Sequence, residues 1–280
     1  MTTGKVILVA AGPGDPDLIT VKAVRYLQKA DIVLTDRLVS KEILERYVNK
    51  AAEIICVGKQ YNAEGSISQT DINAMLLQYA LESKLVVRLK GGDVSIFSNI
   101  LDELETLANN NIPYEIVPGV TAALGAAAYA GIPLTARGLS TSVRFLTYYK
   151  SDIVTDAYWK ELANTNDTLV FYMSSSTLDK VVAKLVENNI DSDKLLAVIE
   201  QATTPLQNVR IVNLYEYEAQ LKGTTFVSPS LVIIGKVVSL HEKFSWLINT
   251  ETKDNYFKAV NGDTDAITKI IKEIEHAGRI

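Results

Sequence analysis

The sequence of 280 residues is poor in the residue types on which several protein classes depend. It contains one cysteine, Cys56, which excludes an intrachain disulfide and a cysteine-based metal site. Its two histidines, His241 and His276, both lie late in the chain. A histidine-rich metal centre and a Ser-His-Asp triad are therefore disfavoured, and we predict no metal site.

Long hydrophobic runs are also lacking. The longest, 117–134, is alanine-rich, is too short to span a bilayer and is interrupted by three glycines and Pro133. The apolar start, 5–11, is shorter than the hydrophobic region of a signal peptide and leads into a Gly-Pro-Gly loop. We therefore predict no membrane association and a reduced, cytoplasmic location.

Positive charge is not in excess either, because 28 basic residues face 33 acidic ones, which gives a net charge of −5. This balance argues against nucleic acid as a partner. Hydrophobic residues make up 48% and charged residues 22%, and the mean hydropathy is +0.11, as in an ordinary folded protein.

Glycine and proline are unevenly distributed. Of 15 glycines and 7 prolines, 16 fall within the first 140 residues. The first half of the chain therefore contains the loops in which backbone can approach a ligand closely.

Hydrophobic periodicity predicts an α/β fold with two α/β domains. In the first half, continuous apolar runs alternate with helical patterns, which is typical of a parallel sheet covered on both faces. The expected strands are 6–10, 32–35, 53–57, 86–89 and 114–117, and the expected helices are 18–29, 41–48, 68–82 and 100–109. The second half contains expected helices at 120–130 and 178–188 and expected strands at 143–148, 168–172, 195–200 and 230–234. We predict domains at 1–118 and 119–241, and a polar extension at 242–280 with a helix over 265–277.

Two expected strand ends in the first half lead into loops that could bind a ligand. Gly12-Pro13-Gly14 follows the first strand, but Asp17 stands where a dinucleotide fingerprint requires its third glycine. A rigid turn is the alternative there. Asp36-Arg37 follows the second strand and offers a base and an anion contact, while a surface ion pair with Asp36 capping the next helix is the alternative.

Three further strand ends have similar features. Gly58-Lys59 offers a proton donor or a carboxylate contact, although an exposed lysine is the simpler interpretation. Gly91-Gly92-Asp93 combines bare backbone with a carboxylate, and a plain turn is the alternative. The small residues 117–131 allow close approach by a sheet, a ligand or a partner, and tight helix packing would explain them equally well.

The order of these segments is more informative than any one of them. Gly-Pro-Gly-Asp-Pro, Asp-Arg-Leu-Val-Ser, Val-Gly-Lys, Val-Val-Arg-Leu-Lys-Gly-Gly-Asp and Val-Pro-Gly-Val-Thr-Ala follow one another along the chain. Together they resemble the tetrapyrrole methylase family over residues 4–240. Asp36–Ser40 with Gly58-Lys59 most resembles the members that methylate uroporphyrinogen III.

This resemblance implies a fold, a cofactor and a reaction. Members of the family are class III methyltransferases that hold S-adenosylmethionine in the cleft between two α/β domains and usually form homodimers. The implied reaction is two successive methyl transfers to uroporphyrinogen III, which give precorrin-2 on the route to sirohaem and cobalamin-type rings, with S-adenosylhomocysteine as by-product.

The resemblance also implies site residues. Asp36 matches the proton acceptor and Lys59 the proton donor. The residues that match the cofactor pocket are Pro13, Gly91, Gly92, Asp93, Ile96, Thr121, Ala122, Met173 and Ala202. Arg37, Arg137 and Arg144 are our candidates for binding the substrate's carboxylates.

The sequence departs from the family pattern mainly at positions expected to face the substrate. Residues 94–103 lack the family's glycines and arginine, Ala136 replaces a histidine, and Ser174 follows Met173 in place of glycine. Two alternative functions therefore stay open. One is methylation of another precorrin or of a non-tetrapyrrole substrate, and the other is a cofactor- or tetrapyrrole-binding protein with little catalysis.

Overall fold

The computed structural model describes residues 3–58, 67–148, 154–250 and 252–257. These residues form two compact units, the first of 3–121 with Phe257 and the second of 122–256. Each unit contains one five-stranded sheet. The helix predicted over 265–277 lies outside the described residues.

The first unit is a three-layer α/β sandwich. Its elements are β1 (Lys5–Ala10), α1 (Val21–Leu27), β2 (Ile32–Thr35), α2 (Lys41–Tyr47), β3 (Glu53–Cys56), α3 (Gln69–Leu81), β4 (Leu85–Lys90), α4 (Leu101–Asn109) and β5 (Tyr114–Val117). The strand order is β3-β2-β4-β1-β5, and all neighbouring strands are parallel. The predicted parallel sheet covered on both faces is confirmed.

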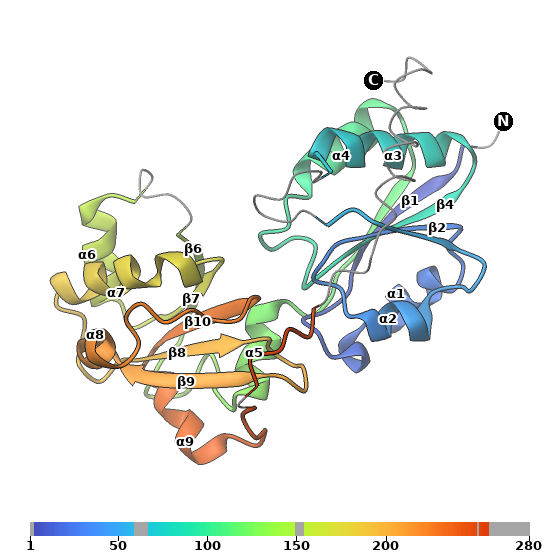
Figure 1. Cartoon of the computed structure of the whole chain (residues 1–280). Coiled ribbons are helices and arrows are strands. Elements are labelled where there is room, and N and C mark those ends of the chain that lie inside the picture. The colour runs from blue at the N-terminus through green and yellow to red at the C-terminus, as the bar shows by residue number, and fades with distance from the viewer. Residues whose placement is uncertain (1–2, 59–66, 149–153, 251, 258–280) are drawn as a thin grey trace. The chain divides into compact units, whose positions relative to one another are not determined.

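Alternate residues of β1 enter different hydrophobic clusters, because side chains alternate across a sheet. Val6 and Leu8 pack with α3 and α4, whereas Ile7 and Val9 pack with α1 and α2. Figure 1 shows these two helix pairs on opposite faces of the sheet. Since both faces are covered, the loops at the ends of the strands are the part of the sheet that a ligand can reach.

Two local details differ from or refine the sequence prediction. The helix expected over 18–29 begins at Val21, because Thr20 is its N-cap and accepts a hydrogen bond from the Ala23 N–H at 3.2 Å. The helix expected over 68–82 begins with a capping box formed by Ser68 and Asp71, in which Asp71 takes the place of the usual Glu or Gln.

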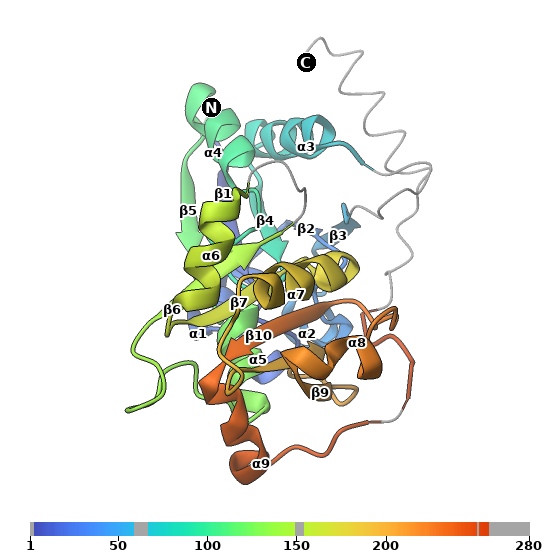
Figure 2. The ribbon, with the colours of Figure 1, turned by 90° about the vertical axis from the view of Figure 1, so that its left-hand side faces the viewer.

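The second unit contains a mixed sheet with the strand order β6-β7-β10-β8-β9. Its elements are α5 (Ala122–Tyr129), β6 (Val143–Thr147), α6 (Asp156–Asn164), β7 (Thr168–Tyr172), α7 (Leu178–Glu187), β8 (Leu195–Glu200), β9 (Asn208–Asn213), α8 (Tyr217–Gln220), β10 (Ser230–Gly235) and α9 (His241–Phe244). β6 and β7 are parallel, and β10 is antiparallel to both β7 and β8. Figure 2 shows α6 and α7 side by side, as their contacts require.

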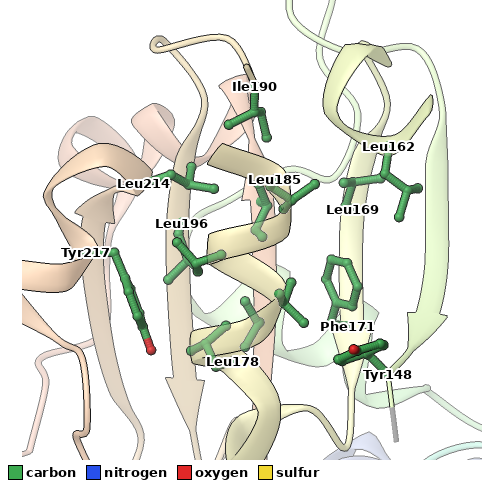
Figure 3. Close-up of a cluster of buried hydrophobic side chains, with 14 of the residues drawn as sticks. Tyr148, Leu162, Leu169, Phe171, Leu178, Leu185, Ile190, Leu196, Leu214 and Tyr217 are labelled. Atoms are coloured by element: carbon green, nitrogen blue, oxygen red, sulfur yellow. The ribbon is translucent and has the colours of Figure 1, made fainter. Parts of the chain in front are cut away.

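One face of this sheet carries the unit's main hydrophobic cluster. Leu178 and Leu185 of α7 point toward Phe171 and Leu196 of the sheet (Figure 3). Full burial of a side chain of this size stabilises the fold by roughly 1.5–3 kcal/mol. The cluster therefore fixes β7 and β8, whose ends carry two of the predicted cofactor residues.

The described start of the predicted C-terminal extension packs within the second unit. The Trp246 indole donates a hydrogen bond to the Ala128 carbonyl at 2.9 Å, and a Cβ on Gly131 would lie 2.2 Å from the Phe244 carbonyl oxygen. Thr250 N–H donates to the Gln207 carbonyl at 3.1 Å. These contacts tie residues 244–250 to the end of α5 and to the loop before β9.

Candidate active site

The carboxyl ends of the five parallel strands bring the predicted loops of the first unit to one edge of its sheet. The register of the paired strands places Thr35 beside Cys56 and Leu89, and Ala10 beside Lys90. The residues of the prediction that lie on these loops are Pro13, Asp36, Arg37, Gly91, Gly92, Asp93 and Ile96. Lys59 lies outside the described residues, so its assignment stays a prediction.

Asp36 is held by backbone N–H groups from two loops. Its Oδ1 accepts a hydrogen bond from Leu38 at 2.9 Å, and its Oδ2 accepts one from Gly91 at 3.1 Å. The alternative that Asp36 caps α2 is wrong, because Ser40 is the N-cap of that helix. A carboxylate held in this way keeps a fixed direction at the strand end.

Gly91 allows this arrangement because a larger residue would not fit. A Cβ on Gly91 would lie 2.8 Å from the Leu38 Cβ and 2.9 Å from the Leu38 carbonyl oxygen. The first glycine of the Gly-Gly-Asp turn thus lets the backbone approach the loop that carries Asp36.

A pocket of about 270 Å³ opens beside Asp36. It combines a carboxylate, two cationic side chains and apolar surface. Its lining residues are Asp36, Leu38, Val57, Gly58, Gln69, Ile72, Arg88, Lys90, Gly91, Ile96, Phe97, Ser98 and Asn99. Residues 96–99 of the pocket lining belong to the segment 94–103, in which the sequence departs from the family.

Asp93 joins two of the strand-end loops. Its Oδ2 accepts a hydrogen bond from Gly119 N–H at 2.8 Å, and its Oδ1 accepts one from Ser95 N–H at 2.8 Å. Burial raises the pKa of Asp93, but these hydrogen bonds outweigh it, so the pKa lies below its usual value of 3.8. The Gly12 and Gly92 backbones also pair, at 2.8 and 3.1 Å.

We expect Asp93→Asn to destabilise the protein in a pH-dependent way. The loss is about 1–3 kcal/mol near neutral pH, because charge-assisted hydrogen bonds are replaced by weaker ones. The folded-state pKa is depressed, so the carboxylate's contribution is present above its unfolded pKa of about 3.9 and is lost as pH falls through the folded value. Urea unfolding of both proteins between about pH 3 and pH 7 tests this.

The exposed carboxylate of Asp17 supplies the control, because its side chain is 78% exposed. Asp17→Asn should change stability by no more than about 0.5 kcal/mol. A wild-type advantage over Asp93→Asn that is the same at acid and neutral pH would contradict the assignment.

Met173 and Ala202 lie at one edge of the second sheet. β7 and β8 are both antiparallel to β10, so their carboxyl ends are on the same side, with the start of β10 between them. Met173 is 54% exposed and adopts a left-handed backbone conformation with φ of 52°. The Oγ of Ser230, the first residue of β10, is buried and has no hydrogen-bond partner within the described residues. This end of the sheet therefore offers the exposed, apolar Met173 side chain to a ligand.

Thr121 and Ala122 lie where α5 begins, and a tyrosine that the sequence analysis missed orients this helix. The Tyr172 hydroxyl accepts a hydrogen bond from Ala123 N–H at 3.0 Å. Tyr172 directly precedes Met173, so the end of β7 and the start of α5 are linked. Only the folded chain brings residues 49 positions apart together.

The three predicted substrate arginines differ in their surroundings. Arg37 is half-buried on the loop after β2, and Arg137 is exposed on a loop of the second unit. Arg144 on β6 is paired with both Glu161 and Asp167, and these partners raise its pKa. Its charge is balanced within the protein, and its role toward substrate stays a prediction.

A buried charge cluster beside the pocket was also missed. Arg88 and Lys90 of β4 both bind Glu103 of α4, at 2.9 Å each. Glu103 falls in the departing 94–103 segment, and its position in the sequence does not indicate this pairing. The spacing of Arg88 and Lys90 does indicate that their side chains lie together, because residues two apart on a strand share a face.

The described residues contain neither a membrane-spanning helix nor a cluster of metal ligands. No helix among them is long and apolar enough to cross a bilayer. No group of three or more histidine, cysteine, aspartate or glutamate side chains within them is arranged to hold a metal ion.

Comparison with known proteins identifies the family to which this fold belongs. The family model for tetrapyrrole (corrin/porphyrin) methylases matches residues 5–218. The chain belongs to the tetrapyrrole methylase family, as its motifs predict, and the predicted α/β fold is confirmed.

Individual relatives are close in sequence. A siroheme synthase from Saccharophagus degradans is 46% identical over 244 residues, which cover 87% of this chain and 53% of that protein. A uroporphyrinogen-III C-methyltransferase from Bacillus subtilis is 41% identical over 258 residues, which cover 92% of this chain and 100% of that protein. The chain thus spans about half the length of the siroheme synthases it matches.

A solved structure of a member of this family is also similar to this chain. The uroporphyrin-III C-methyltransferase of Thermus thermophilus, complexed with S-adenosylhomocysteine, is 33% identical with a TM-score of 0.69. The match covers 84% of this chain and 93% of that one.

Proposed function

We propose that this chain is an S-adenosylmethionine-dependent C-methyltransferase that makes two successive methyl transfers to uroporphyrinogen III. The observation that carries the proposal is the fixed carboxylate of Asp36 at the wall of a pocket, bound to the Gly91 N–H of the Gly-Gly-Asp turn. The names of the Bacillus subtilis and Thermus thermophilus relatives support it.

Each unit by itself contains residues of the kinds that S-adenosylmethionine binds. In the first unit, the Gly91 backbone and the Ile96 side chain line the pocket. In the second unit, Met173 is exposed. When bound, the cofactor supplies a methyl group on a positively charged sulfur. S-adenosylhomocysteine is the corresponding by-product.

The chain's own contribution is alignment and proton transfer. A pyrrole carbon must lie in line with the methyl group and the sulfur, and holding reactants in that geometry removes much of the entropic barrier. A proton then leaves the methylated ring, and the Asp36 carboxylate is placed to accept it. Lys59 is our proposed proton donor. We also propose that the chain forms a homodimer, which sedimentation analysis tests.

Product mass tests the proposed function. The pure protein is incubated with S-adenosylmethionine and enzymatically made uroporphyrinogen III, and we expect a product that has gained two methyl groups. Binding of S-adenosylhomocysteine without methylation would favour a binding protein with little catalysis. Methylation of another precorrin but not of uroporphyrinogen III would favour the other alternative.

Neutral replacement of Arg37 or Arg137 is expected to raise the KM for uroporphyrinogen III with a smaller effect on kcat. Each arginine is proposed to bind a substrate carboxylate, and loss of one such contact weakens binding about tenfold. Initial rates of Arg37→Gln and Arg137→Gln measure the effect.

Arg46→Gln is the matched control, because Arg46 lies on α2 and pairs with Glu42 on the same helix. It should leave KM unchanged. Unchanged KM in both Arg37→Gln and Arg137→Gln would contradict their assignment.

A further inference from the structure

The buried cluster at the end of β4 places more positive than negative charge beside the pocket. Arg88 is 5% exposed, Lys90 is 4% exposed and Glu103 is fully buried. Arg88 Nε donates to Glu103 Oε1 and Lys90 Nζ donates to Glu103 Oε2. Two buried cations therefore share one hydrogen-bonded carboxylate, in a position where charge is costly to bury.

The two cations differ in how far their donors are occupied. Arg88 also donates to the backbone carbonyls of Leu34 and Leu89, at 3.3 and 3.2 Å. Within the described residues, Glu103 is the one hydrogen-bond acceptor of Lys90, although an ammonium group has three N–H donors. Lys90 lines the pocket and can therefore bind a further acceptor there.

Asp36 does not supply that acceptor in the structure. Its two oxygens accept hydrogen bonds from the Leu38 and Gly91 backbones. Burial and the neighbouring Arg88 charge lower the pKa of Lys90, whereas Glu103 and Asp36 oppose that shift. A ligand carboxylate at Lys90 would accept hydrogen bonds from the ammonium donors that Glu103 leaves unoccupied.

We propose that Lys90 binds a carboxylate group of the tetrapyrrole substrate in this pocket, and that Glu103 is the positioning residue that holds the Lys90 ammonium there. This inference rests on the proposed function, because that function supplies a substrate bearing carboxylates. It assigns to Glu103 a role that does not require contact with substrate.

Binding of uroporphyrin III, the oxidised and unreactive form of the substrate, tests the proposal without methyl transfer. Fluorescence titration measures its Kd, and calorimetry measures the Kd of S-adenosylhomocysteine. Lys90→Met should weaken uroporphyrin binding roughly tenfold or more, because one charged hydrogen bond is lost. Lys90→Arg should stay close to wild type, and cofactor affinity should change in neither variant.

Lys194 supplies the matched control. It is buried in the second unit, where its ammonium donates to the Ala163 and Thr165 carbonyls. Lys194→Met removes a buried lysine but should leave uroporphyrin affinity unchanged. Equal uroporphyrin affinity in Lys90→Met and wild type would overturn this inference but not the proposed function. A wild-type chain that binds S-adenosylhomocysteine but no uroporphyrin would overturn the proposed function as well.

The pH profile of Glu103→Gln tests the positioning role. Binding requires protonated Lys90, so affinity is present below the Lys90 pKa and is lost as pH rises through it. Among the described residues, the charged groups that face Lys90 are Arg88, Glu103 and Asp36. Removing the Glu103 charge lowers the Lys90 pKa further, so affinity should fall at a lower pH than in wild type. A profile that coincides with wild type would overturn the positioning role.

Discussion

The Asp36→Asn variant is expected to lose methyl transfer by about 10²–10⁴-fold in kcat while it keeps its affinity for S-adenosylhomocysteine. The amide retains an oxygen that can accept a backbone hydrogen bond, so the loop should stay in place. It cannot accept the proton that leaves the ring, so the methylated ring returns its methyl group more often than it loses the proton, and net methyl transfer falls. Single-turnover kinetics with product mass analysis measure the loss.

Asp31→Asn is the matched control for this experiment. Asp31 directly precedes β2, as Asp36 directly follows it, and its Oδ2 accepts the Leu85 N–H at 2.8 Å. Both carboxylates thus bind a backbone N–H beside the same strand, but Asp31 is at the opposite edge of the sheet. Asp31→Asn should retain kcat. Undiminished kcat in Asp36→Asn would remove the proposed role of Asp36 without affecting the family assignment.

The Gly119→Ala variant is expected to lose about 1–3 kcal/mol of stability, because the added methyl group overpacks the end of β1. A Cβ on Gly119 would lie 2.6 Å from the Ala10 Cβ, closer than two such atoms can approach. Relief of that contact would displace the Gly119 N–H from Asp93 Oδ2 and weaken cofactor binding. Urea unfolding and calorimetry measure the two effects.

Exchanging the residues at positions 10 and 119 tests whether the contact with Ala10 causes this loss of stability. The double variant Ala10→Gly with Gly119→Ala removes the nearest clashing atom and leaves the next contacts, with the Ala10 carbonyl group, at 3.4 and 3.5 Å. It should recover most of the lost stability. Ala10→Gly alone should cost about 0.5–1 kcal/mol, the usual effect of glycine in a strand. Additive losses in the double variant would show that the Ala10 contact is not the cause.

Local pattern predicted the first unit well because its strands are continuous apolar runs between amphipathic helices. β9 was missed because Asn208, Arg210 and Asn213 interrupt its apolar residues, which is typical of an edge strand with one exposed face. Glycine positions and strand ends also indicated Asp36 and Asp93. These two site residues could be predicted because the carboxyl ends of parallel strands lie at the same side of a sheet.

The contacts that complete the site depend on tertiary structure. The pairing of Glu103 with Arg88 and Lys90 joins a helix to a strand through the core, and no local rule links these positions. The Tyr172 bond to Ala123 joins residues on two different elements. Ser174, which the sequence analysis treated only as a departure from glycine, is buried and hydrogen-bonded to the Tyr148 and Tyr172 backbones.

The coupling of the strand-end loops limits how this protein can be engineered. Gly12 pairs with Gly92, and Asp93 holds Gly119, so three loops from distant parts of the chain are fixed in length as well as in composition. One residue inserted into any of them would shift the other two. A peptide tag or sensor domain would be better inserted in the turn at Lys222–Gly223, where a Cβ on Gly223 would meet nothing within 4 Å.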